Sequence, residues 1–316
     1  MSDELAPMNV AELMDRAIWA YKKSFWKQIA YAAIVGVIFT VVVFVVALIA
    51  IITAVMHMFA GVGYMIGFAG FFGIIILVGL PLYLLWMGFS SAGHILLTRR
   101  ALFGHIVNLP RVKIHIMAFR AISALLAQVV VFAPVIVLMF FVFRALAVPF
   151  LDGIVEGFSL LFVILFVVAS LFVSLVFMLI ANFFSLSVAA AMFEGKLFFK
   201  SLSRSWELMR GDFWKIFGTR LLWFLVAMAF AMAGQGIISL LWMLIGIILG
   251  TGPAVLSIIV LPVGFLTSVV SFMVSFAQIP MDGIMQACIY YNQRIKKDGL
   301  DIELRLTALR QTRTPK

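Results

Sequence analysis

The feature that most constrains this chain is its long apolar runs without charge, the first of which covers residues 29–56. A transmembrane helix needs about 20 consecutive apolar residues, so a run of this length is sufficient to cross a bilayer. Charged residues make up only 11% of the chain, compared with roughly 25% in a soluble domain. A water-soluble globule of this length could not bury so much apolar surface, and we therefore expect lipid to surround most of the chain.

The apolar runs also decide the type of membrane structure. They lack the alternation of apolar and polar residues that marks the strands of a membrane β-barrel, so each run predicts a helix. We predict an all-α integral membrane fold of six transmembrane helices in three hairpins. This membrane domain, 29–289, follows a cytoplasmic amphipathic helix at 1–28 and precedes a basic cytoplasmic tail at 290–316. The predicted spans lie at about residues 29–56, 66–97, 117–149, 158–192, 216–249 and 253–288.

The distribution of Lys and Arg predicts how the chain crosses the membrane. Of the 23 basic residues, 22 lie in the N-terminal segment, in the tail, or in the connections after the second and fourth spans and the first turns of the spans that follow them; Arg144 is the exception. Cytoplasmic segments of membrane proteins carry an excess of Lys and Arg, so these segments should face the cytoplasm. We therefore expect a multi-pass protein of the bacterial cytoplasmic (inner) membrane with both termini in the cytoplasm.

A short motif occurs twice, directly before the first and the fifth predicted spans. Residues 15–29 align with residues 203–217. In each copy, apolar residues recur at helical spacing with charged residues on the other face, which is the pattern of a helix lying in the membrane interface. We predict interfacial helices within 1–28 and 194–215. Aromatic and basic side chains in both copies are the expected anchors at head-group level: Trp19, Trp26, Trp206, Trp214, Lys27, Lys215, Arg16 and Arg204.

Local signals predict where these amphipathic helices begin and end. Asn9, followed three residues later by Glu12, has the sequence of a capping box, which predicts a helix that starts after Asn9. Gly211 should end the second amphipathic helix, because glycine readily takes the left-handed conformation found at helix C-termini. Asp212 should then cap the helix that follows.

Polar residues gather at the cytoplasmic ends of the even-numbered spans. Gln278, Asp282 and Gln286 are spaced four residues apart in the sixth span and so share one helix face. Asn182 and His94 lie near the corresponding ends of the fourth and second spans. Polar and ionisable residues at membrane depth are candidates for function, so the five could line a pocket for a proton, an ion or a lipid head group. Alternatively, they hydrogen-bond across helices, each contributing roughly 1 kcal/mol.

No catalytic or metal-binding motif stands out in the sequence. Cys288 is the only cysteine, which excludes an internal disulfide and a multi-cysteine metal site. The histidines lack a metal-binding spacing such as HExxH, and no serine lies in a nucleophile-elbow motif. The net charge of +10 is accounted for by the topology. We expect no enzymatic activity, no metal, no cofactor and no nucleic-acid partner.

Three segments together resemble a known family. They are Asp15-Arg-Ala-Ile-Trp-Ala-Tyr-Lys-Lys-Ser-Phe-Trp, Arg204-Ser-Trp-Glu-Leu-Met-Arg-Gly-Asp-Phe-Trp and Tyr290-Tyr-Asn-Gln-Arg-Ile-Lys-Lys-Asp-Gly-Leu-Asp-Ile-Glu-Leu. The chain is similar over nearly its whole length to uncharacterised six-span bacterial and archaeal proteins grouped with the membrane domain of glycerophosphoryl diester phosphodiesterases. The resemblance implies a six-helix membrane domain of unknown role. It implies no phosphodiesterase activity, because the soluble catalytic domain is absent from this sequence.

Two hypotheses for function follow from these features. The first is a non-enzymatic envelope scaffold or accessory subunit, which interacts with anionic membrane lipid through its amphipathic helices and has membrane-protein partners or a second copy of itself. The alternative is a transporter or lipid-handling protein, which uses a polar pocket in the cytoplasmic half of the bundle.

Overall fold

All regular structure in the described part of the chain is helical, as predicted. The computed structural model describes residues 6–59, 75–104, 113–151, 159–249 and 253–313, and these ranges contain no strand. The elements in chain order are α1 (Val10–Phe59), the π-helical turn η2 (Ile75–Gly79), α3 (Leu80–Phe103), α4 (Ile114–Leu151), α5 (Ser159–Phe183), α6 (Ser187–Glu194), α7 (Phe199–Met209), α8 (Phe213–Leu249), α9 (Pro253–Asp298) and α10 (Leu300–Arg313).

Several of these helices have the length and composition of membrane spans. In the described part of the chain, 5 stretches are long and apolar enough to cross a bilayer, and they overlap the first five predicted spans: Val10–Thr53, Leu77–Phe103, Ile114–Val135, Val167–Glu194 and Phe213–Leu240. The chain therefore has the helices of a membrane protein. The sixth predicted span, 253–288, falls on α9, where few side chains before Phe276 are described, and it stays a prediction.

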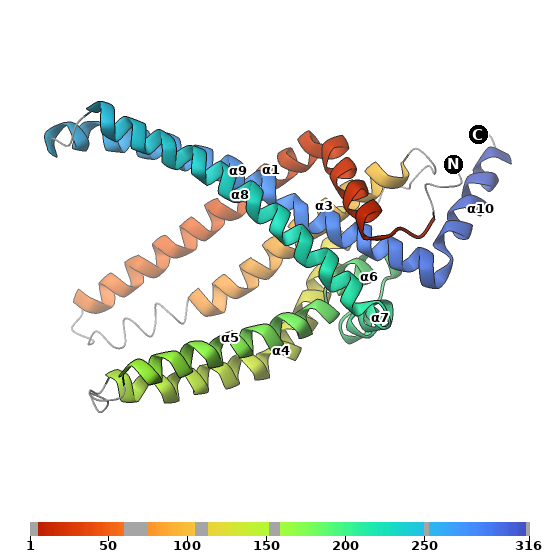
Figure 1. Ribbon diagram of the computed structural model, residues 1–316, viewed down its shortest axis with the longest axis horizontal. Coiled ribbons are helices and arrows are strands. Elements are labelled where there is room, and N and C mark those ends of the chain that lie inside the picture. The colour runs from red at the N-terminus through yellow and green to blue at the C-terminus, as the bar shows by residue number, and fades with distance from the viewer. Residues whose placement is uncertain (1–5, 60–74, 105–112, 152–158, 250–252, 314–316) are drawn as a thin grey trace.

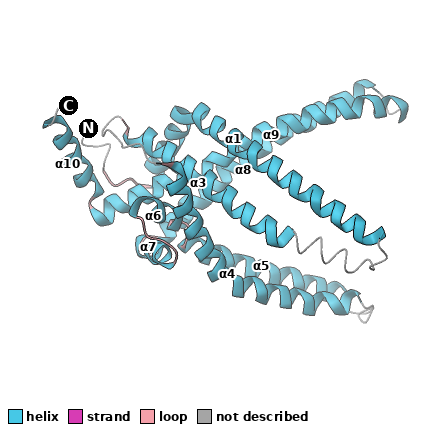
Figure 2. Cartoon of the chain, turned by 180° about the vertical axis from the view of Figure 1, so that it is seen from behind, coloured by secondary structure: helices cyan, strands magenta, loops and turns pink. Residues whose placement is uncertain are grey.

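The long helices converge at one end of the molecule and diverge from it. α8 and α9 run side by side, and so do α4 and α5 (Figure 1). The same pairs are seen from behind, where α6, α7 and α10 gather at the converging end with both chain termini (Figure 2). The short amphipathic elements thus lie together at one end of the long helices.

The buried core lies at this converging end. It combines the first turns of α1 and the ends of α3 and α9 with α6 and α7, and its members include Leu13, Ala17, Ile95, Ala190, Leu208 and Ile289. Farther along the helices, large apolar side chains are exposed: Phe44 of α1 and Phe172 of α5 are each 66% exposed. Such surfaces would be costly in water, but they suit hydrocarbon.

The first amphipathic segment differs from the predicted interfacial helix. Its start is confirmed, because the Asn9 backbone N–H donates to the Glu12 carboxylate (3.0 Å) and the Glu12 N–H donates to Asn9 Oδ1 (2.9 Å). However, the predicted helix at 1–28 and the predicted span at 29–56 form one continuous helix, α1. Its apolar face packs into the protein core, where Ala17 is fully buried. Periodicity predicts an apolar face but does not specify whether lipid or protein covers it.

In the second copy of the motif the helix ends at a position where the helix of the first copy continues. α7 ends at Met209, and Gly211 follows with a φ of +93°, which confirms that Gly211 terminates this helix. The aligned position in the first copy is Lys23, which stays helical. Glycine takes positive φ without the steric cost that a Cβ brings. α8 begins directly after Asp212, whose carboxylate lies 3.9 Å from Lys215 Nζ and 3.7 Å from Lys296 Nζ.

Candidate functional site

A cavity of about 510 Å³ opens among the helices beside the buried core. Side chains from α3, α4, α5, α6, α8 and α9 line it. Much of its wall is apolar and includes Met87, Leu125, Phe132, Met178, Leu221 and Phe224. This volume is within the range of ligand sites, which are typically about 300–1,000 Å³ and mostly apolar with a few placed polar groups.

Four of the five residues predicted to form a polar pocket line this cavity. Asn182 of α5 meets Gln278, Asp282 and Gln286 of α9. Ser185, in the turn after α5, joins them. The structure therefore brings together residues that are about 100 positions apart in the sequence, because α5 and α9 approach the same space from different sides.

Three buried polar atoms around this cavity have no hydrogen-bond partner among the described residues. They are Asn182 Nδ2, Ser185 Oγ and Gln286 Oε1. An unsatisfied buried polar group costs about 1–3 kcal/mol, so three around one space need an explanation. Between them they offer hydrogen-bond donors and an acceptor. A ligand head group that both accepts and donates hydrogen bonds would satisfy them.

Two charged side chains that line the cavity, Arg220 and Asp282, form an ion pair. The Arg220 guanidinium of α8 lies 3.5 Å from the Asp282 carboxylate, which also accepts a hydrogen bond of 2.8 Å from Gln286 Nε2. Arg220 is one of the 22 basic residues that the sequence assigns to the cytoplasmic side, and it is not among the predicted site residues. Arg220 lies about one turn after Phe217 and one turn before Phe224 on α8, a spacing that could have placed the three on the same face.

Other polar side chains near the cavity bond across helices, as the alternative interpretation predicted. Gln278 Nε2 donates to the Ala227 carbonyl (2.9 Å). Gln128 Nε2 donates to the Phe184 carbonyl (2.9 Å) and to Ser187 Oγ (2.7 Å). The polar residues at these helix ends therefore differ: Gln278 joins α9 to α8, whereas Asn182 Nδ2 has no hydrogen-bond partner among the described residues.

His94 lies outside this cavity. Its Nδ1 is 2.6 Å from Gln28 Oε1 of α1, and Gln28 Nε2 donates to Thr98 Oγ1 (3.2 Å). A Cβ added to Gly283 of α9 would lie 2.8 Å from His94 Cβ, so the α9 backbone packs closely against this histidine. His94 belongs to a buried polar contact between α1 and α3.

Arg204, a predicted membrane anchor, is the centre of an ion-pair network within the protein. Its guanidinium bonds both carboxylate oxygens of Glu194 (3.1 and 2.9 Å), Glu207 (3.2 Å) and, through a short contact, Asp298. Burial lowers the pKa of Arg204, but the hydrogen bonds and charge of these carboxylates outweigh burial and leave the pKa raised. Arg294 also bonds Asp298 (3.1 Å), so the network fastens α7 to the end of α9.

The other predicted anchors are partly or largely exposed. Trp26 and Trp214 are 78% and 72% exposed, and Lys27 and Lys215 beside them are exposed as well. Trp19 and Trp206, about two turns earlier in the two copies, make more contacts within the protein. Trp19 contacts the charged groups of Arg16 and Lys23, and Trp206 stacks on Phe183 with ring centroids 4.3 Å apart.

The comparisons with known proteins give no relative: no family model, curated protein or solved structure matches this chain. The resemblance to the phosphodiesterase-associated membrane family therefore stays a prediction. Within the described residues, no group of three His, Cys, Asp or Glu side chains is placed to hold a metal ion.

Proposed function

We propose that this chain is a non-enzymatic, multi-pass protein of the bacterial cytoplasmic membrane that binds a lipid-like amphipathic molecule in the cavity. The observation that carries the proposal is a set of three buried polar atoms, on Asn182, Ser185 and Gln286, that have no partner among the described residues and lie around a largely apolar space. An amphipathic ligand places hydrocarbon against the apolar wall and its head group against these atoms. Binding of this kind is common to lipid-handling proteins and to transporters of amphipathic substrates.

The proposed topology is six spans with both termini in the cytoplasm. It is supported by the segregation of 22 of the 23 Lys and Arg residues and by the helices of sufficient length. In this orientation the cavity lies toward the cytoplasmic side of the bilayer, because α6 lines it and packs against α7, which carries Lys200 and Arg204. The ligand would therefore enter from the inner leaflet or from the cytoplasm.

The proposal is tested by filling the cavity and by removing its polar end. Ala181→Trp places an indole in the cavity, whereas Ala169→Trp adds the same group to α5 at a position that does not line it. Native mass spectrometry of the full chain in detergent should show a bound lipid-sized mass that Ala181→Trp removes and Ala169→Trp retains. Asn182→Leu keeps the volume but removes the amide, and it should weaken retention about tenfold, the effect of roughly 1.4 kcal/mol of lost hydrogen bonding.

Retention that is unchanged in both Ala181→Trp and Asn182→Leu would contradict the proposal. If retention is lost equally in Ala181→Trp and Ala169→Trp, the bound mass comes from annular lipid and the cavity has no specific ligand. Circular dichroism of each variant checks that the helices are intact, so that loss of binding is not loss of the fold.

A second candidate function is an envelope scaffold or accessory subunit held on anionic lipid. The observation that favours it is the exposure of Trp26 and Trp214, each followed by an exposed lysine. Flotation with vesicles cannot test an integral protein, so the measurement is co-purification of membrane-protein partners with the full chain and with a Trp26→Ala/Trp214→Ala variant. Loss of a partner in that variant supports the scaffold, whereas retention of the partner in both refutes a role for these side chains.

A further inference from the structure

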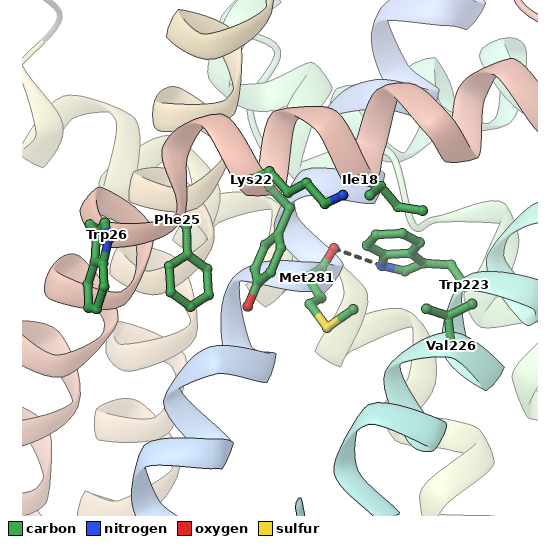
Figure 3. A pocket seen from close by; sticks show the side chains of 8 residues that line it. Ile18, Lys22, Phe25, Trp26, Trp223, Val226 and Met281 are labelled. Carbon is green, nitrogen blue, oxygen red and sulfur yellow. Dashed lines mark hydrogen bonds between the residues drawn. The ribbon is translucent and has the colours of Figure 1, made fainter. Parts of the chain in front are cut away.

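A second space lies on the outer surface of the molecule, between α1 and α8, and α9 forms its floor. It has a volume of about 410 Å³, and we call it the α1–α8 groove. Figure 3 shows its two walls facing one another across this space, with α9 between them. Its lining residues are Ile18, Tyr21, Lys22, Phe25 and Trp26 of α1, Trp223 and Val226 of α8, and Met281 of α9.

Two hydrogen bonds fix the walls of the groove to its floor. Tyr21 of α1 donates its hydroxyl to the Ala277 carbonyl of α9 (2.8 Å). Trp223 of α8 donates its indole N–H to the Met281 carbonyl of α9 (2.9 Å), the bond drawn in Figure 3. Each bond joins a side-chain donor to a backbone carbonyl of α9, so a wall that moved away from α9 would leave the Tyr21 hydroxyl or the Trp223 indole N–H without this partner. The groove is therefore formed before any ligand binds.

Among the described residues that line the groove, Lys22 has the one charged side chain. This lysine is exposed and makes no ion pair with any residue that the structure describes. The remaining lining is aromatic and aliphatic, and Trp26 is 78% exposed. Lys22 and Trp26 precede the predicted span at 29–56, which places them at the level of lipid head groups, where such residues concentrate.

We propose that the α1–α8 groove binds one anionic phospholipid of the inner leaflet. Lys22 pairs with the phosphate or with an additional head-group charge, and an acyl chain lies between Phe25 on α1 and Val226 on α8. Charge complementarity selects an anionic lipid, because the one ionic group among the described residues that line the groove is a cation, Lys22. The proposal depends on the membrane location proposed above, but it does not depend on a ligand in the inner cavity.

The groove and the inner cavity are neighbouring but separate spaces. Trp223 and Met281 line both of them, and both side chains are almost fully buried. A variant that fills one space can therefore be compared with a variant that fills the other. This allows the groove lipid to be distinguished from the cavity ligand.

The experiment measures lipid retention by native mass spectrometry of the full chain after incubation with phosphatidylglycerol or phosphatidylcholine. Wild-type protein should retain phosphatidylglycerol in preference to phosphatidylcholine. Lys22→Gln should weaken phosphatidylglycerol retention about fivefold, which is the effect of one lysine near an anionic surface. The matched control is Lys27→Gln, which removes the same charge from an exposed position on α1 outside the groove, and Lys22→Arg should retain the lipid.

A filling variant tests whether the acyl chain lies in the groove. Val226→Trp should abolish the preference for phosphatidylglycerol, whereas Leu222→Trp, on α8 but outside both spaces, should keep it. Equal losses in Lys22→Gln and Lys27→Gln would overturn the proposal in favour of diffuse attraction to the basic end. Loss of the preference for phosphatidylglycerol in Ala181→Trp but not in Val226→Trp would also overturn the proposal. That result would place the anionic lipid in the inner cavity and would leave the proposed function intact.

Discussion

Replacing Arg204 with Gln should destabilise the protein by about 2 kcal/mol. The side chain of Arg204 is 15% exposed and that of Glu194 is 13% exposed, so their interaction is largely shielded from solvent. Removing one partner of a buried ion pair costs about 3–5 kcal/mol. The cost should be smaller here, because Glu194 keeps Tyr290 (3.0 Å) and Lys196 (3.3 Å). Glu207 is 57% exposed, and a pair of that kind contributes only about 0–1 kcal/mol.

The assay is equilibrium unfolding of the purified chain in mixed micelles with increasing SDS, followed by tryptophan fluorescence. The matched control is Arg210→Gln, which removes the same charge from an exposed position at the end of α7 and should change the free energy of unfolding by less than about 0.5 kcal/mol. A double-mutant cycle of Arg204→Gln with Asp298→Asn should give a coupling energy of about 0.5–3 kcal/mol, since the two side chains are in contact.

Equal effects of Arg204→Gln and Arg210→Gln would refute this reasoning, because the structural role of Arg204 depends on its partners and not on its charge alone. A coupling energy near zero would refute it as well. If Arg204→Gln instead left stability unchanged but reduced retention of phosphatidylglycerol, Arg204 would be the membrane anchor that its sequence position predicted.

Two glycines give further predictions that the same unfolding assay can check. A Cβ at Gly93 would overlap the ring of Tyr31, so Gly93→Ala should separate α3 from α1 and lower the free energy of unfolding by about 1–3 kcal/mol. The control is Gly218→Ala, where nothing lies within 4 Å, and it should be neutral or stabilising by up to about 1 kcal/mol. Equal effects of the two variants would contradict the close packing of α3 on α1 at Gly93. Gly211→Ala meets no atom within 4 Å either, but its φ is +93°, so it should destabilise by about 1–2 kcal/mol through backbone strain alone, and a stabilising effect would show that this turn does not require glycine.

Local sequence signals were sufficient to predict features that depend on interactions between residues close together in the chain. The capping box at Asn9 formed because both of its partners lie within one helical turn. The chain turns at Gly211 because positive φ is a property of that residue type. The helical, membrane-spanning class followed from the charge-free apolar runs, since only a helix or a closed barrel satisfies the backbone in lipid.

The candidate site was only partly predictable, because its members are joined by tertiary contacts. The spacing of Gln278, Asp282 and Gln286 correctly placed them on one face, and Asn182 joined them. His94 has the same depth in the predicted topology, but α9 packs against it through Gly283 and leaves it bonded to Gln28. Depth along a span does not specify rotation about the helix axis, and rotation decides which space a side chain enters.

The sequence by itself therefore determined the helices, their apolar and polar faces and the two copies of the amphipathic motif. Only the tertiary structure decided what covers each face. Arg16 and Arg204 occupy aligned positions, yet Arg16 lies over Trp19 of its own helix, whereas Arg204 meets Asp298, 94 residues away. The physical reason is that amphipathic periodicity is a property of one helix, whereas burial and ion pairing depend on which helix lies opposite.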